Sequence, residues 1–137
     1  MLQILLIEDN PADVYLLEEA LRLNTLCEIT VLSNGDSAGR YLSQIGETRS
    51  RPDFIILDLN LPGPDGTELL GLIRSIPALA SVYVAVLSSS PKDVVGFRAA
   101  EANCYLRKSS NLDEFMALGE EIVSRYQVNK VESTPGT

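Results

Sequence analysis

The sequence predicts an α/β protein in which a mostly parallel sheet is covered by helices on both faces. Short apolar runs, partly β-branched, alternate along the 137-residue chain with segments of helical spacing. Parallel neighbours need crossover connections, and continuous apolar runs suit strands that are buried on both sides. Five strands in strict alternation with five helices therefore predict a doubly wound (βα)5 domain.

The elements follow one another at short intervals. The strands are expected at residues 3–7, 28–32, 53–57, 82–87 and 103–106. The first helix opens at Asn10-Pro11, an N-cap followed by proline at the first helical position. The other helices are expected at residues 35–45, 66–76, 91–102 and 111–126. Residues 1–126 are expected to form one domain, and residues 127–137, which lack an apolar period, a flexible C-terminal tail.

Composition excludes several classes of function. A net charge of −8 argues against a nucleic-acid surface, because such surfaces rely on Lys and Arg to replace phosphate counterions. Cys27 and Cys104 are too isolated for a disulfide framework or a zinc site. The sequence contains no histidine. This excludes histidine as a general base, as a metal ligand, and as the partner of a serine or cysteine nucleophile. With no basic leader and no apolar run long enough for a membrane span, a cytoplasmic protein is expected.

Acidic residues end two of the expected strands. Glu8 and Asp9 follow the first strand, and Asp58 follows the third. If these strands are neighbours, the three carboxylates meet at the carboxyl edge of the sheet, where ligands of such sheets bind. Asp53 begins the strand that Asp58 ends, roughly 17 Å away at about 3.3 Å per residue, and cannot join them. Crowded carboxylates favour the binding of a hard cation. Mg²⁺ suits this edge of the sheet best, because proteins often hold it with carboxylates together with a phosphate.

Two further strand ends supply a hydroxyl group and a cation. The fourth strand runs into Ser88-Ser89-Ser90 and the fifth into Lys108-Ser109. Phosphoryl transfer to an aspartate needs a nucleophilic carboxylate, metal-binding acids, a hydroxyl donor and an ammonium group. The metal and the lysine offset the charge on the phosphoryl oxygens.

These motifs resemble the receiver domain of two-component response regulators. The resemblance covers about residues 2–126 and rests on Glu8-Asp9, Asp58, Ser88 and Lys108 at four strand ends. It implies a flavodoxin-like sheet in the order 2-1-3-4-5. It also implies a phosphoacceptor signalling protein, which supports its own phosphorylation and dephosphorylation, and not an enzyme for an external substrate. The donor would be a histidine on a sensor kinase, which fits the absence of histidine here.

The resemblance assigns roles to the acidic residues. Asp58 would accept the phosphoryl group. Asp9, Asp58 and the backbone carbonyl of Asn60 would ligate Mg²⁺, and Glu8 would act through water.

The same resemblance assigns roles to the other strand ends. Ser88 and Lys108 would contact the phosphoryl oxygens, Ser89 would leave access to the acceptor, and Tyr105 would change rotamer on phosphorylation. The family usually carries a cis-proline after its lysine, whereas Ser109 stands here. A cis bond before a non-proline residue costs about 3 to 4 kcal/mol, so this bond is either trans in a reshaped connection or a strained cis peptide held by its surroundings.

Taken singly, the same residues have simpler explanations. Glu8-Asp9 also suits a turn or helix cap, Asp58 an Asx-turn, and Ser88 a strand exit. Lys108 also suits a plain salt bridge, and Tyr105 a half-buried strand aromatic. Their combination at four strand ends favours the functional interpretation.

Three short segments resemble the small standalone regulators that partner bacterial and cyanobacterial phytochromes. They are Arg51-Pro52-Asp53, Asn60-Leu61-Pro62-Gly63, and Asn103-Cys104-Tyr105-Leu106 followed by Lys108-Ser109. The resemblance implies a phytochrome-type histidine kinase as partner. Because no output domain is expected after the fifth helix, signalling would use protein contacts. Family habit implies self-association through the fourth helix, fifth strand and fifth helix.

Two other functions remain open. A metal-dependent phosphatase of the haloacid dehalogenase type also forms an aspartyl phosphate, but it carries Asp-x-Asp after its first strand. Here the candidate nucleophile follows the third strand, and Asn60 replaces the second acid. A phosphorylation-independent adaptor would keep the fold and use only its surface, although it would have no need of the four charged residues together.

Overall fold

The computed structural model describes residues 1–61, 66–89 and 102–132, and five parallel strands form one sheet in the order β2-β1-β3-β4-β5. The strands are β1 (Leu2–Ile7), β2 (Cys27–Leu32), β3 (Phe54–Asp58), β4 (Tyr83–Ser88) and β5 (Cys104–Arg107). The helices in these ranges are α1 (Pro11–Asn24), α2 (Gly35–Ser43), α3 (Gly66–Ser75) and α5 (Leu112–Glu132), with a 3₁₀ turn η1 (Pro77–Leu79). The predicted fold class and strand order are confirmed. The predicted fourth helix, 91–102, lies almost wholly outside the described residues.

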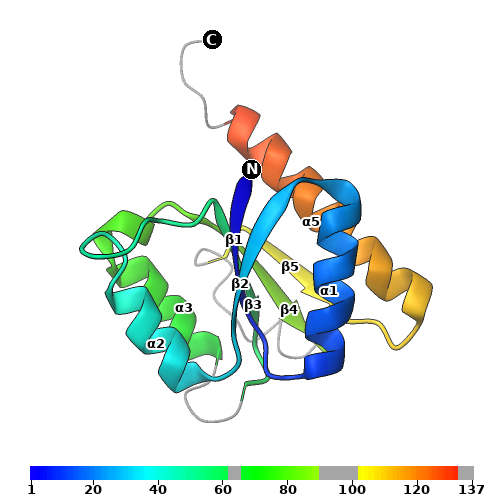
Figure 1. Ribbon diagram of the computed structural model, residues 1–137, viewed down its shortest axis with the longest axis horizontal. Coiled ribbons are helices and arrows are strands. Elements are labelled where there is room, and N and C mark those ends of the chain that lie inside the picture. The colour runs from blue at the N-terminus through cyan, green and yellow to red at the C-terminus, as the bar shows by residue number, and fades with distance from the viewer. Residues whose placement is uncertain (62–65, 90–101, 133–137) are drawn as a thin grey trace.

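Helices cover both faces of the sheet, α1 with α5 on one and α2 with α3 on the other (Figure 1). Successive residues of a strand point to opposite faces. In β1, Ile4 and Leu6 accordingly pack with α1 and α5, whereas Leu5 and Ile7 pack with α2 and α3. Every residue of β3 is buried, as expected for a strand inside a parallel sheet.

The start of α1 matches its predicted cap. Asn10 Oδ1 accepts hydrogen bonds from the backbone N–H groups of Ala12 (2.9 Å) and Asp13 (3.2 Å), and Pro11 occupies the first helical position. These bonds satisfy donors that a helix leaves unpaired at its first turn. The first turn of α1 is thereby fixed beside the end of β1.

Helix α5 runs to Glu132, six residues beyond the predicted end at Tyr126. Tyr126 is buried against Phe54 and Tyr83, with ring centroids 4.7 and 5.8 Å away. No glycine or proline lies between this anchor and Pro135 to stop the helix. The part of the predicted tail up to Glu132 is therefore helical, and residues 133–137 lie outside the described structure.

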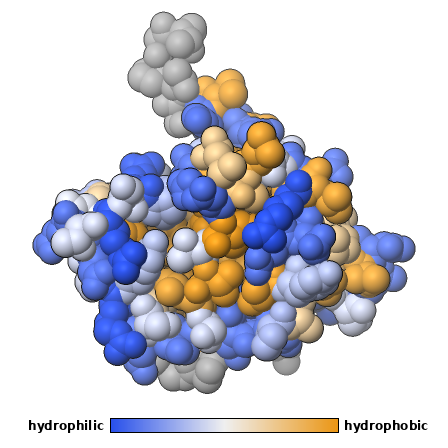
Figure 2. Space-filling model, viewed as in Figure 1, coloured by the Kyte–Doolittle hydropathy of each residue, from blue (hydrophilic) through white to orange (hydrophobic). Residues whose placement is uncertain are grey.

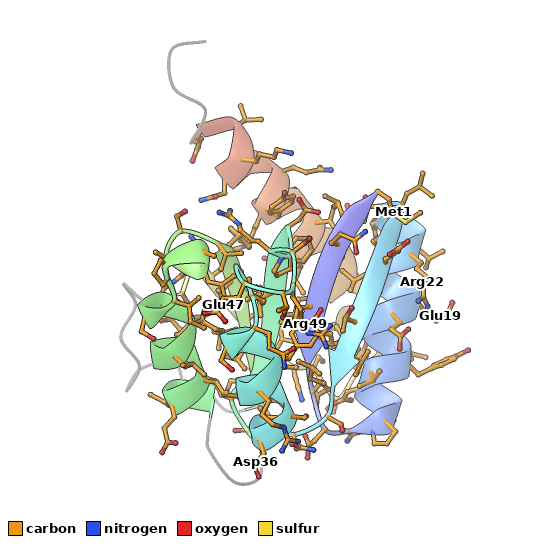
Figure 3. All side chains as sticks on the ribbon, turned by 60° about the vertical axis from the view of Figure 1, so that its left-hand side comes forward. Met1, Glu19, Arg22, Asp36, Glu47 and Arg49 are labelled. Carbon is orange, nitrogen blue, oxygen red and sulfur yellow. The ribbon has the colours of Figure 1, made fainter. Side chains whose placement is uncertain are left out.

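The carboxyl ends of all five strands share one edge of the sheet. Figure 3 shows Met1 at the opposite, amino edge and Asp36 at the carboxyl edge, where α2 begins. Asp58 and Ser88 are the last residues of β3 and β4, whereas the sequence had placed them just after these strands. At the amino edge, Asp53 Oδ2 accepts the N–H of Gln3 (2.7 Å), so Asp53 is remote from Asp58 as predicted.

The surface over β2 is only partly covered, as befits an edge strand. Cys27, Ile29 and Val31 are partly buried against the α1 side, whereas Glu28 and Thr30 are exposed. In Figure 2, apolar residues gather in the middle of this view and hydrophilic ones surround them. None of the helices in the described ranges combines the length and apolarity needed to cross a bilayer.

Candidate functional site

Three carboxylates meet at the carboxyl edge of the sheet. Strands β1 and β3 are neighbours, with Ile7 beside Leu57, so Glu8 and Asp58 emerge side by side. One oxygen from each of Glu8, Asp9 and Asp58 lies within 4.8 Å of the others. Glu8 and Asp58 are 0% and 2% exposed, whereas Asp9 is open to solvent. The predicted convergence of the two strand ends is present.

Lys108 brings a positive charge to these acids from the end of β5. Its Nζ lies 2.7 Å from Glu8 Oε2, 3.1 Å from Asp58 Oδ2 and 3.0 Å from Asp13 Oδ2. The side chain of Lys108 is 12% exposed. One ammonium group is thus shared among three carboxylates at the edge of the core.

Asp13 is the member of this group that the sequence did not predict. It lies in the first turn of α1, where an acidic residue commonly favours the positive end of the helix dipole. That ordinary role gives no signal of a contact with a residue 95 positions away. The available signal was the helix start at Asn10-Pro11, which places the first turn of α1 next to Asp9.

The buried carboxyl group of Glu8 is incompletely satisfied. Its Oε1 accepts the N–H of Asn10 at 3.1 Å. Its Oε2 contacts Lys108 as an ion pair outside hydrogen-bonding geometry, and among the described residues no donor hydrogen-bonds to it. Burial and the neighbouring Asp58 raise the pKa of Glu8 to about 7, although Lys108 acts in the opposite direction.

Lys108 remains an ammonium group in this environment. Burial by itself lowers the pKa of a lysine. Glu8 outweighs that effect, together with Asp58 and Asp13, so the pKa of Lys108 is raised above its ordinary value.

The donor set fits a hard divalent cation. Three carboxyl groups, those of Glu8, Asp9 and Asp58, converge here, and one buried oxygen of Glu8 accepts no hydrogen bond from any described residue. Such cations take oxygen ligands and offset the repulsion between crowded carboxylates. The edge of the sheet is therefore a candidate site for a divalent cation.

Asn60 and the end of β4 frame Asp58. The backbone N–H of Asn60 donates to Asp58 Oδ1 at 3.0 Å, and its side-chain amide donates to Ser89 Oγ at 2.7 Å. Ser88 is fully buried, and its carbonyl accepts the N–H of Lys108 at 2.8 Å. These bonds hold the ends of β3, β4 and β5 together around the acid cluster.

Tyr105 and Ser109 lie on either side of Lys108. Tyr105 is half-buried on β5 and packs on the α2 and α3 side of the sheet, so its role as a switch stays a prediction. The Lys108-Ser109 bond is trans, because the described residues contain no cis peptide. Ser109 Oγ accepts the N–H of Asn111 (3.0 Å) and donates to Glu114 (2.6 Å), which reshapes the connection as a helix start for α5.

The chain is similar to known signalling proteins over most of its length. Residues 4–119 match the family model of the response regulator receiver domain. Response regulator Rcp1 of Synechocystis sp. (strain ATCC 27184 / PCC 6803 / Kazusa) is 40% identical over 126 residues, which cover 88% of this chain and 86% of Rcp1.

Solved structures show the same similarity. The phosphorylated cyanobacterial phytochrome response regulator RcpA has a TM-score of 0.83 at 40% identity, covering 92% of this chain and 94% of that chain. The Mn²⁺-bound form of Rcp1 has a TM-score of 0.80 at 40% identity, covering 90% and 93%. TrrA from Thermotoga maritima, in complex with Mg²⁺-BeF, has a TM-score of 0.72 at 28% identity, covering 91% and 99%.

Proposed function

Because this chain belongs to the response regulator receiver family and is a phosphoryl-accepting two-component regulator, we propose that Asp58 is the acceptor and that Mg²⁺ is the metal at its side. The observation that carries this proposal is the environment of Asp58. Its carboxylate is buried, Oδ1 accepts the N–H of Asn60, and Oδ2 faces the ammonium group of Lys108. Contacts to both oxygens fix the orientation of this carboxylate, and the neighbouring ammonium group favours the approach of a negatively charged phosphoryl group.

The transfer forms one bond and breaks another. A carboxylate oxygen of Asp58 bonds to phosphorus while the bond between phosphorus and the donor breaks, and its electron pair returns to the donor. The negative charge of the carboxylate is consumed in the acyl phosphate. Lys108 offsets charge on the phosphoryl oxygens, and the Ser88 hydroxyl donates a hydrogen bond to one of them.

Mg²⁺ would be held by Asp9, Asp58 and the backbone carbonyl of Asn60, with Glu8 acting through water. When bound, it supplies positive charge to the phosphoryl oxygens. The converging oxygens of the acid cluster support this assignment. So do the metal-bound relatives, one with Mn²⁺ and one with Mg²⁺-BeF.

The donor would be a phosphohistidine of a sensor kinase, of the phytochrome type by similarity to RcpA and other phytochrome regulators. The protein would support its own phosphorylation and later hydrolysis. Its partners would be cytoplasmic proteins and not nucleic acid, in keeping with a net charge of −8. Self-association would use the fourth helix, β5 and α5, and the change at Asp58 would be transmitted with a rotamer change of Tyr105.

The acceptor is tested by intact-mass spectrometry after incubation with Mg²⁺ and acetyl phosphate. The wild type is expected to gain one acid-labile phosphoryl group, and Asp58→Asn none. Asp53→Asn is the matched control, because it makes the same substitution just before the amino end of the same strand and should be phosphorylated like the wild type. Equal labelling of Asp58→Asn would refute the assignment, and an unlabelled wild type would favour the adaptor.

The kinase class is tested by mixing the protein with purified phosphorylated kinases. Transfer from a phytochrome-type kinase is expected to be at least tenfold faster than from an unrelated histidine kinase. Equal rates would contradict the phytochrome assignment and leave the acceptor assignment intact. Steady turnover of an external phosphomonoester would instead indicate the phosphatase.

A further inference from the structure

Lys108 contacts two kinds of carboxylate. Glu8 and Asp58 belong to the group of acids whose oxygens converge within 4.8 Å. Asp13 contacts Lys108 at 3.0 Å but is not a member of that group. The carboxylate of Asp13 therefore forms an ion pair with Lys108 and is not part of the candidate metal site.

We propose that Asp13 is a positioning residue for phosphoryl transfer: it is the carboxylate that Lys108 keeps as a partner while Asp58 reacts. This inference rests on the proposed role of Asp58 as acceptor. It adds to that site a residue that the sequence motifs do not assign.

The location of Asp13 suits an anchor. It lies in the first turn of α1, its N–H is held by Asn10 Oδ1 at 3.2 Å, and its side chain is only 23% exposed. Helix α1 itself is fixed on the sheet by Leu17 and Leu21, which are fully buried. Asp13 thus projects from a rigid element, whereas Lys108 carries a long side chain with several rotatable bonds.

Lys108 needs such an anchor because its other partners change during the reaction. Asp58 Oδ2 is 3.1 Å from Nζ in this structure, but an acyl phosphate no longer carries the carboxylate charge. Asp58 would also be a ligand of the proposed divalent cation, and Glu8 would bind a water of that cation, so both acids would have a second partner besides Nζ. An ammonium group has three N–H donors, so a bond to Asp13 leaves two for the phosphoryl oxygens.

The matched control is another acidic residue of α1. Glu18 pairs with Arg22 at 3.0 Å, and its side chain is 25% exposed, close to the 23% of Asp13. Figure 3 shows Arg22 on the outer side of α1. Glu18→Gln and Asp13→Asn remove the same charge from the same helix, and only Asp13 touches Lys108.

The first measurement is the rate of phosphorylation by acetyl phosphate at saturating Mg²⁺. Asp13→Asn is expected to be roughly tenfold slower than the wild type, the scale of a charged hydrogen bond, whereas Glu18→Gln should stay within about twofold. Asp13→Glu, which restores the charge, should recover part of the loss. Thermal unfolding of each variant establishes that it is folded.

A double-mutant cycle shows whether Asp13 acts through Lys108. In a Lys108→Met background, Asp13→Asn is expected to change the rate by less than about twofold, because the shared partner is gone. A second readout is independent of phosphorylation: the ¹⁵Nζ signal of Lys108, one of three lysines with Lys92 and Lys130, should shift and exchange faster with solvent in Asp13→Asn.

The inference would be overturned if Asp13→Asn matched Glu18→Gln in rate, or if its effect persisted undiminished without Lys108. Either result leaves the acceptor assignment in place, provided that the wild type is phosphorylated and Asp58→Asn is not. A wild type that fails to be phosphorylated would overturn the proposed function itself, and this positioning role with it.

Discussion

Glu8 is a fully buried carboxyl group whose pKa is raised to about 7 by burial and by Asp58. Between its unfolded pKa, near 4.5, and its folded pKa, the native protein binds a proton that the unfolded chain has released. The stabilisation from this proton is complete below about pH 4.5. It is lost as the pH rises through 7.

Glu8→Gln is therefore expected to change how stability depends on pH. Without divalent cations, the unfolding free energy of the wild type should fall relative to that of Glu8→Gln between pH 5 and 8, by on the order of 3 kcal/mol. Urea unfolding at several pH values measures this difference. Glu19→Gln, at an exposed position of α1, should track the wild type. Parallel curves for wild type and Glu8→Gln would contradict the assigned pKa.

The sequence predicted the members of the site that lie at strand ends. Glu8, Asp9, Asp58 and Lys108 could be found because apolar strands and parallel order bring their carboxyl ends to one edge. Asp13 could not, because an acidic residue in a first helical turn already has a local explanation. Its contact with Lys108 depends on the tertiary position of α1, which no short motif encodes.

Helices α1 and α5 pack closely against each other at Gly119. A β-carbon at Gly119 would lie 2.5 Å from Ala20 Cβ and 2.6 Å from the Ala20 carbonyl carbon. Such distances cannot be met without moving the backbone of one helix. The close approach of α1 and α5 therefore depends on the missing side chain.

Gly119→Ala is expected to destabilise the protein by about 1 to 3 kcal/mol, the usual cost of overpacking a core. Gly71→Ala in α3 is the matched control. Nothing lies within 4 Å of its added β-carbon, so helix propensity should stabilise the fold by about 0.5 to 1 kcal/mol. Chemical denaturation of both variants measures the two shifts, and a stabilising Gly119→Ala would contradict the packing described.

Periodicity predicted the strands and helices well and their ends less well. Asp58 and Ser88 close their strands instead of following them, because pairing with neighbouring strands continues through these residues. Both strands also begin one residue later than predicted. The length of α5 was underestimated, because the burial of Tyr126 against aromatic residues of the sheet is a tertiary contact. The 3₁₀ turn η1 was not foreseen, since so short an element has no period of its own.

The whole molecule carries a net charge of −8, and four carboxyl groups at one edge contribute to it. A cation that binds there in the folded state and not in the unfolded chain stabilises the protein by mass action. At a concentration one hundred times its Kd, the gain is about 2.7 kcal/mol.

Mg²⁺ is accordingly expected to raise Tm by several degrees, and Asp9→Asn to lose most of that rise. Calorimetry with and without Mg²⁺ measures the effect. NaCl at matched ionic strength is the control, because screening of the general negative charge also stabilises the fold. A rise of equal size in Asp9→Asn would indicate screening instead of a site.

The contact between Ala20 and Gly119 also governs when the fold can be completed during synthesis. A ribosome finishes α1 and all five strands before it adds residue 119. Until then, Leu17 and Leu21 cover their face of the sheet without α5 beside them. Exposed apolar surface of this kind is what chaperones bind in nascent chains. A nascent chain that still lacks α5 therefore exposes the apolar surface that Leu17 and Leu21 bury in the finished fold, and it is prone to aggregation.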